Sequence, residues 1–142
     1  MRNYVRLFTL VNLTINMKVK IDTKEKFHVI TLMEPILSDN IAADLLELST
    51  KLLQEKIKNV VLNLSNTDTI EVDNAANELA QIQQMFYENN ASFVICNVQP
   101  SVEETLEELE LFEILNVTPT ESEAWDIVQM EEIERELLDE EE

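Results

Sequence analysis

The sequence predicts one α/β domain, with its strands and helices in the order β-β-α-β-α-β-α-β-α across 142 residues. Short runs rich in valine and isoleucine alternate with longer segments whose apolar residues recur at helical spacing. Strands separated by helices of this length favour crossovers into a largely parallel sheet. A hairpin at the start adds an antiparallel edge. We therefore expect a mixed central sheet covered by helices.

The hairpin is read from two short patterns near the start of the chain. Val19 and Ile21 alternate with polar residues, which is typical of a half-buried strand. Residues 23–26 form the expected turn, and residues 27–32 form the second strand. Pro35 is expected to end that strand, because proline has no backbone N–H for the ladder.

The middle of the chain predicts two helices and two buried strands. Ser38 or Asp39 is expected to cap the first helix. Residues 59–64 and 92–98 are apolar on both faces, as in central strands. The two expected buried helical stripes are Ile41, Leu45, Leu48 and Leu52, then Ala75, Leu79, Ile82 and Phe86.

Two further helices are predicted near the end of the chain. Residues 101–104 follow Pro100 and read as a capping box, and residues 120–123 read as a second one. A short strand is expected at residues 115–118. Trp125, Val128 and Ile133 continue the last helix.

The predicted domain covers residues 17–138. Residues 1–16 form an N-terminal extension with two open interpretations. Met17 is the translation start in one of them; in the other, an alternation of apolar and polar residues from Val11 to Ile21 makes part of the extension continuous with the first strand. Residues 139–142 are expected to form a frayed acidic tail.

Charge is distributed unevenly along the chain, whose formal net charge is −19. Residues 1–58 carry nine basic and seven acidic side chains, whereas residues 59–142 carry one basic and 22 acidic side chains. The second part would repel nucleic acid and anionic membranes, and it favours a protein partner with a basic surface. The simpler interpretation is that these acids form solvated helix faces that aid solubility.

The composition of the chain excludes one class of phosphate site and sets expectations for its rare residues. The chain has no glycine, so phosphate-binding loops that need glycine are excluded. The single Cys96 lies in an apolar run and is expected to be a buried thiol. The single His28 is expected on a strand surface with no catalytic role. No signal peptide or membrane-inserting segment is predicted, so a cytoplasmic location is the expectation.

The turn at residues 67–74, between a buried strand and a helix, is the predicted centre of function. Small α/β domains often place their sites where a strand ends against a helix N-terminus. Unpaired N–H groups and the helix dipole attract an anion there. Asp73 stands where the helix is expected to begin.

The order of elements and several local segments resemble the STAS domain, the fold of bacterial anti-sigma factor antagonists. The resemblance spans about residues 17–130 and predicts a STAS-like fold. It is carried by residues 29–32, 34–40, 60–74, 93–102, 106–111, 115–117 and 121–125.

The resemblance also implies a site. In that family the turn typically reads Asp-Ser-Ser-Gly, and a serine at the helix start is phosphorylated by a partner kinase that is also an anti-sigma factor. Glu71 falls on the family aspartate, Asp73 on the phosphorylated serine and Asn74 on the glycine. Asp73 is then either a fixed, partial imitation of phosphoserine or simply a good helix cap. Ser65 and Thr69 are nearby hydroxyls that could be modified instead, or are turn residues.

The leading hypothesis is a non-enzymatic interaction module for signal transduction and transcription regulation, which binds an anti-sigma, kinase-like protein. The expected partner-binding residues are Ser38, Asp39, Asn40, Thr67, Asp68, Glu71, Asp73 and Asn74. The alternative is an accessory structural subunit of a larger complex such as a membrane transporter. An enzyme using Asp68, Glu71 and Asp73 on Mg²⁺, or as an acid/base pair, is a third class. No catalytic residue, metal site or cofactor is predicted.

Overall fold

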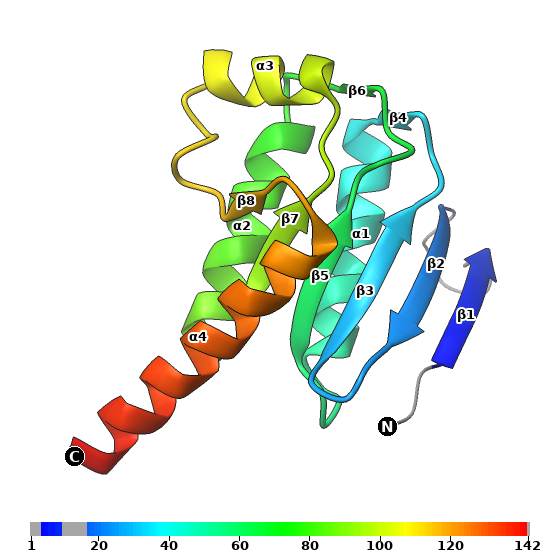
Figure 1. The fold of residues 1–142 in the computed structure, drawn as a ribbon. Coiled ribbons are helices and arrows are strands. Elements are labelled where there is room, and N and C mark those ends of the chain that lie inside the picture. Colours follow the sequence, from blue (N-terminus) through cyan, green and yellow to red (C-terminus); the bar gives the residue numbers. More distant parts are fainter. Residues whose placement is uncertain (1–3, 10–16, 142) are drawn as a thin grey trace.

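The computed structural model describes residues 4–9 and 17–141, with side chains for residues 17–139 (Figure 1). The main sheet of these residues has the strand order β1-β2-β3-β5-β7-β8. The three strands from β1 to β3 pair antiparallel, and the pairs β3–β5, β5–β7 and β7–β8 are parallel. Their bounds are β1 Tyr4–Thr9, β2 Lys18–Thr23, β3 Phe27–Leu32, β5 Asn59–Asn63, β7 Phe93–Cys96 and β8 Val117–Thr118. The predicted mixed sheet is confirmed.

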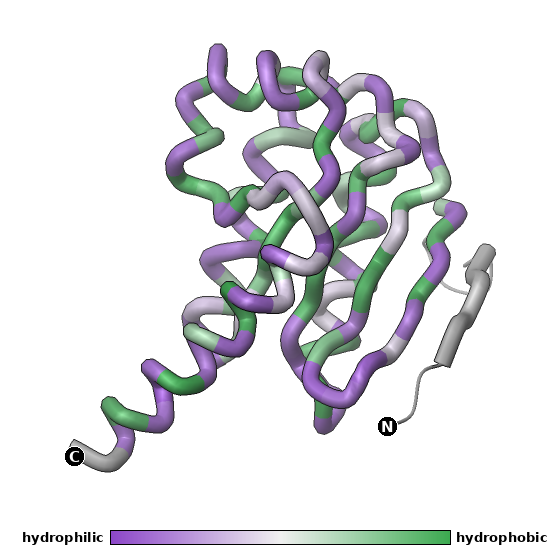
Figure 2. The backbone as a smooth tube through the Cα atoms, viewed as in Figure 1, coloured by the Kyte–Doolittle hydropathy of each residue, from purple (hydrophilic) through white to green (hydrophobic). Residues whose placement is uncertain are grey.

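Helices cover both faces of this sheet. Helices α1 (Asp39–Leu52) and α2 (Ala75–Glu88) pack on one face, and α4 (Glu121–Glu141) crosses the other. Helix α3 (Pro100–Glu108) lies beyond the carboxyl ends of the strands, next to the short strand β6 (Thr69–Ile70). Apolar residues are concentrated in the central strands, and further apolar bands recur along the outer part of α4 (Figure 2).

Strand β5 shows why the sequence predicts burial on both of its faces. Val60 and Leu62 belong to the larger core under α1 and α2, whereas Val61 belongs to the smaller core under α4. Residues that alternate along a strand point to opposite faces, so a strand between two helical layers must be apolar throughout.

The predicted helical stripes are largely confirmed. Leu45, Leu48 and Leu52 of α1 are buried, and so is the whole predicted stripe of α2. Ile41 is only half-buried at the start of α1.

Of the caps predicted for α1, α3 and α4, two are confirmed. The Ser38 hydroxyl accepts a hydrogen bond from Ile41 N at 3.2 Å and caps α1. The Thr120 hydroxyl accepts from Glu123 N at 3.2 Å, as a capping box requires. The box at residues 101–104 is wrong, because α3 already begins at Pro100 with Gln99 as its N-cap. Proline suits the first helical position, since the N–H it lacks would have no partner there.

Both ends of the chain differ from expectation. Residues 4–9 form a separate strand that pairs with β2, and the alternation expected from Val11 onward lies mostly outside the described residues. Helix α4 continues to Glu141, so the frayed tail predicted at residues 139–142 is wrong as far as Glu141. Glutamate and leucine have high helix propensity, which favours continuation of the helix.

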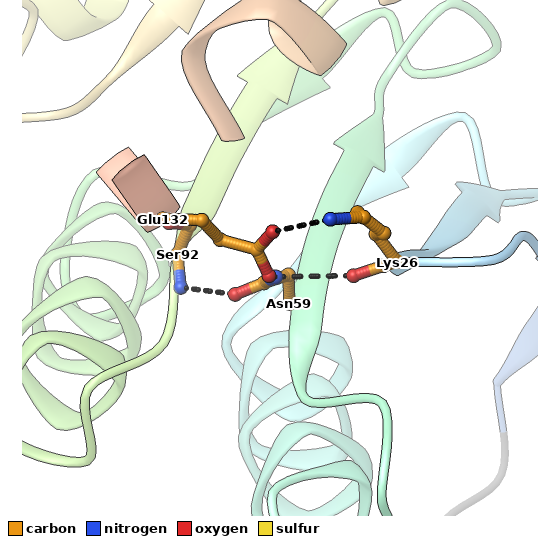
Figure 3. A network of polar contacts seen from close by, with 4 residues as sticks. All are labelled: Lys26, Asn59, Ser92 and Glu132. Atoms are coloured by element: carbon orange, nitrogen blue, oxygen red, sulfur yellow. Dashed lines mark hydrogen bonds and ion pairs between the residues drawn. The ribbon is translucent and has the colours of Figure 1, made fainter. Parts of the chain in front are cut away.

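The amino ends of the parallel strands are held by a polar network around the buried Asn59 (Figure 3). The Asn59 side chain donates to Lys26 O at 3.0 Å and to Glu132 Oε2 at 2.8 Å, and it accepts from Ser92 N at 2.8 Å. Lys26 Nζ lies 3.5 Å from Glu132 Oε1. These contacts fix α4 against the starts of β3, β5 and β7.

His28 also belongs to this end of the sheet, and its prediction as a surface residue is wrong. The side chain is 1% exposed. Its Nε2 lies 2.8 Å from the Ile57 carbonyl and its Nδ1 lies 2.9 Å from the Thr23 hydroxyl. A carbonyl only accepts, so Nε2 carries the proton in this contact. The ring is buried because β3 lies between β2 and β5, a neighbourhood that the local alternation does not reveal.

Candidate functional site

The predicted turn is built from two loops at the carboxyl ends of the strands. Strand β4 (Ile36–Leu37) pairs in parallel with β6 (Thr69–Ile70) as a two-stranded sheet. Asp68 N donates to Pro35 O at 2.7 Å, and Glu71 N donates to Leu37 O at 3.0 Å. The loop before α1 and the loop before α2 therefore form one unit.

An acidic side chain from each of these two loops caps the helix that follows the other loop. Glu71 Oε1 accepts from Asp39 N at 2.8 Å. Asp39 Oδ1 in turn accepts from Asn74 N at 3.1 Å and from Ala75 N at 2.8 Å. Each carboxylate satisfies orphan N–H groups of the other loop's helix and lies at the positive end of that helix dipole. Asp39 and Glu71 thus fix the geometry of the site.

Asp73 stands at the helix entrance but does not cap it. The N-cap of α2 is Asn74, which makes no side-chain capping bond. Asp73 is exposed, and it has no hydrogen bond or ion pair with the described part of the chain. The interpretation of Asp73 as a cap is therefore wrong. The physical reason is that Asp39 reaches across and takes the first N–H groups of the helix.

Of the other predicted residues in the turn at residues 67–74, one is buried and supports the turn, and one is exposed. Thr67 is fully buried, and its hydroxyl donates to Glu34 O at 2.9 Å. Asp68 is exposed, and its carbonyl accepts from the Ser101 hydroxyl at 2.5 Å. Thr67 thus holds the turn from inside, whereas the Asp68 carboxylate faces solvent.

The loop before α1 divides in the same way. Ser38 is half-buried as the cap of α1, and Asn40 is exposed in the first turn of that helix. The two hydroxyls considered as alternative modification targets, Ser65 and Thr69, are both exposed.

Sequence reasoning missed the apolar part of this surface. Val72 is 58% exposed, directly before Asp73, and Ile36 is 50% exposed on β4. The available signal was an apolar residue between two acids in an otherwise polar turn. Ile36 is exposed because it alternates along β4 with Leu37, whose side chain is the one that is buried.

The structure also shows how the acids considered for Mg²⁺ and the thiol of Cys96 are placed. The described residues contain no group of three His, Cys, Asp or Glu side chains arranged to hold a metal ion. Of the three acids considered for Mg²⁺, Glu71 is engaged by Asp39 N. Cys96 is buried as predicted, and burial, with a smaller contribution from Glu121, raises the pKa of its thiol from 9.0 to about 12. That thiol stays protonated at neutral pH and is a poor nucleophile.

The STAS domain family matches residues 18–124 of the chain. The chain belongs to the STAS domain family. Proteins with STAS domains are typically regulators rather than enzymes. None of the helices in residues 17–141 combines the length and apolar composition needed to cross a membrane.

Solved structures share this fold at low sequence identity. An anti-sigma factor antagonist from Mycobacterium paratuberculosis has a TM-score of 0.68 and 13% identity, over 80% of this chain and 95% of that one. The unphosphorylated anti-sigma factor antagonist SpoIIAA has a TM-score of 0.60 and 15% identity, over 89% of this chain and 96% of that one. No curated protein sequence matches the chain closely enough to add a relative.

A membrane protein contains a similar domain. The murine anion transporter Slc26a9 has a TM-score of 0.63 and 12% identity, over 91% of this chain but only 22% of that one. At such identities the likeness establishes the fold alone.

Proposed function

We propose that this STAS domain is a non-enzymatic interaction module that binds an anti-sigma factor or a related kinase-like regulator. The contact surface is the turn at residues 67–74, together with the first turn of α2 and the loop at residues 38–40. By occupying its partner, the domain makes that partner release a competing protein. A cytoplasmic location is part of the proposal, since the partner would be a regulator of transcription.

The observation that carries the proposal is the free, exposed carboxylate of Asp73 at a helix entrance whose caps are supplied by other residues. An aspartate that capped α2 would be explained by its contribution to the stability of that helix. Asp73 makes no such contribution in the described structure, and exposed Val72 beside it adds apolar area. An apolar group next to an unpaired charge on a fixed turn is well suited to partner contact.

The resemblance to phosphorylated family members gives Asp73 a specific role in this proposal. Phosphoserine carries about −1.5 to −2 charges at neutral pH, whereas aspartate carries one on a shorter arm. Asp73 would act as a fixed, weaker version of the modified state. The domain would then interact with its partner without a phosphorylation switch at this position.

The charge of the surrounding surface supports a basic partner. The exposed acids Asp68, Glu71 and Asp73 share this end of the domain with α3, where Glu104, Glu107 and Glu108 are exposed. Lys24, Lys26, Lys56 and Lys58 lie in the turns at the opposite end of the sheet. A partner with a basic surface would be steered to the acidic end.

Affinity capture from the source cells tests the proposal. The tagged domain should recover an anti-sigma or kinase-like regulator, and the Asp73→Lys variant should bind that protein at least about tenfold more weakly. Asp126→Lys is the matched control, because Asp126 is an exposed acid on α4, away from the turn. Equal loss in both variants would mean that only net charge matters. Recovery of a transporter instead would favour the accessory-subunit alternative.

A further inference from the structure

A groove between α2 and the second half of α4 gathers the most exposed apolar side chains that the structure describes. Among the exposed large hydrophobic residues, Tyr87, Leu138 and Ile114 have the highest exposed fractions, at 77%, 61% and 60%. All three line the same groove, which has a volume of about 780 Å³. They come from α2, from α4 and from the loop before β8.

The rim of this groove is acidic. Glu88, Glu131 and Glu134 line it, against the single guanidinium of Arg135. Arg135 also donates to the Ser92 hydroxyl at 3.2 Å, so its guanidinium is already engaged within the domain. A peptide bound in this groove would therefore contact apolar side chains with carboxylates beside them.

Hydrogen bonds hold both walls in place. The Gln83 side chain of α2 donates to Ile114 O at 2.6 Å and accepts from Asn116 N at 2.7 Å, so it fixes the loop that carries Ile114. On the other wall, Glu131 of α4 accepts from Asn116 Nδ2 at 3.2 Å, and the neighbouring Glu132, outside the groove, is tied to Asn59 at 2.8 Å (Figure 3). The groove is preformed, and binding would require little ordering of the domain.

We propose that this groove binds a positively charged amphipathic helix of a partner protein. The apolar face of such a helix would lie on Tyr87, Ile114 and Leu138, in the manner of a helix in a groove. Its flanking lysine or arginine side chains would reach the acidic rim. A second copy of this chain is disfavoured as the occupant, because its net charge of −19 would bring like charges together.

This surface goes beyond the proposed function at the turn. Tyr87 lies twelve positions after Ala75 in α2. At a rise of 1.5 Å per residue they place the groove about 18 Å along the helix from the turn. Both surfaces could therefore be occupied at once.

The test uses a synthetic helical peptide of about 18 residues, long enough to form a helix on binding. Its leucines are spaced to form one face, and lysines fill its flanks. The control peptide has the same composition with the leucines scattered. Binding is followed by fluorescence anisotropy of a labelled peptide and by the amide chemical shifts of the full domain.

Two adjacent positions of α4 provide matched variants. Leu138 lines the groove, whereas Leu137 is 54% exposed and is not among the residues that line it. We expect Leu138→Glu to weaken binding by about tenfold or more and Leu137→Glu by less than about threefold. Shift changes in the unmodified domain should centre on Gln83, Tyr87, Ile114 and Leu138.

Three results would overturn the proposal. Equal binding of the scattered-leucine peptide would mean general charge attraction only. Equal losses in the two leucine variants would place the peptide elsewhere. A domain that is dimeric in solution and becomes monomeric on Leu138→Glu would identify a second copy as the occupant. Asp73→Lys should leave peptide binding unchanged, so failure here is distinct from failure of the proposed function.

Discussion

At the amino ends of the parallel strands, Asn59 is 5% exposed and its amide group makes three hydrogen bonds. At the carboxyl ends, Asp73 is exposed and makes no polar contact with the described residues. Both are polar residues next to a strand or helix boundary. Asn59 is used by the fold, whereas Asp73 is, in our proposal, a contact for the partner.

The loops around these residues differ in the same sense. At the amino ends, side chains from the turn before β3, from β5 and from α4 converge on one polar network around the buried Asn59 (Figure 3). At the carboxyl ends, Asp39 and Glu71 brace the two helix entrances, and Val72 and Asp73, which follow Glu71, are exposed. We call Asp39 and Glu71 the frame of the turn, because they stabilise the helix entrances, and Val72 and Asp73 its free tip, because they are exposed. Stability and partner contact are therefore expected to depend on different residues of the same turn.

The largest effect is expected at the amino ends. Asn59→Ala removes the three hydrogen bonds of a buried side chain and leaves Ser92 N without its partner, so the free energy of unfolding should fall by about 3 kcal/mol. Urea denaturation measures this change. Asn77→Ala is the control, because Asn77 is exposed in α2 and alanine is a better helix former.

A smaller effect is expected from the shared caps. Asp39→Ala removes the acceptor for two N–H groups at the start of α2 and should cost about 1–2 kcal/mol. Asp73→Ala should change stability by less than about 0.5 kcal/mol, as expected for an exposed residue without contacts. If Asp73→Ala lowered the free energy of unfolding as much as Asp39→Ala in the same urea titrations, Asp73 would have a structural role and would not be a free tip.

The smallest effect at neutral pH is expected from the buried thiol. The pKa of Cys96 is raised from 9.0 to about 12 in the folded state, so the fold favours the protonated form. Its contribution to stability is complete below pH 9.0 and is lost as pH rises from there through about 12.

Comparison of the native chain with Cys96→Ala isolates this contribution. The native chain should lose stability more steeply than the variant above pH 9.0. A thiol reagent at pH 8 should also react far more slowly with folded than with unfolded protein, and equal rates would show that Cys96 is accessible.

Local patterns in the sequence were sufficient to predict most of the fold. The stripe of α2 and the doubly buried β5 follow from periodicity, which requires only residues close in sequence. The capping box at Thr120 is equally local. The box at residues 101–104 failed because Pro100 can itself occupy the first helical position.

The candidate site was harder to predict, because its decisive contacts join residues far apart in sequence. Asp39 was expected to serve its own helix, yet it caps one that begins 36 residues later. That exchange depends on the pairing of β4 with β6, two short strands with no recognisable pattern. The burial of His28 likewise depends on which strands flank β3.

The central claim is that the free tip, Val72 and Asp73, contacts the regulatory partner. The frame residues Asp39 and Glu71 and the other acidic surfaces do not make this contact. Hydrogen exchange of the domain, alone and in complex with the captured partner, tests it most directly. The account predicts that slowed exchange on binding is strongest in the turn at residues 67–74 and the start of α2. Protection confined to α3 or α4, with that turn unchanged, would contradict it.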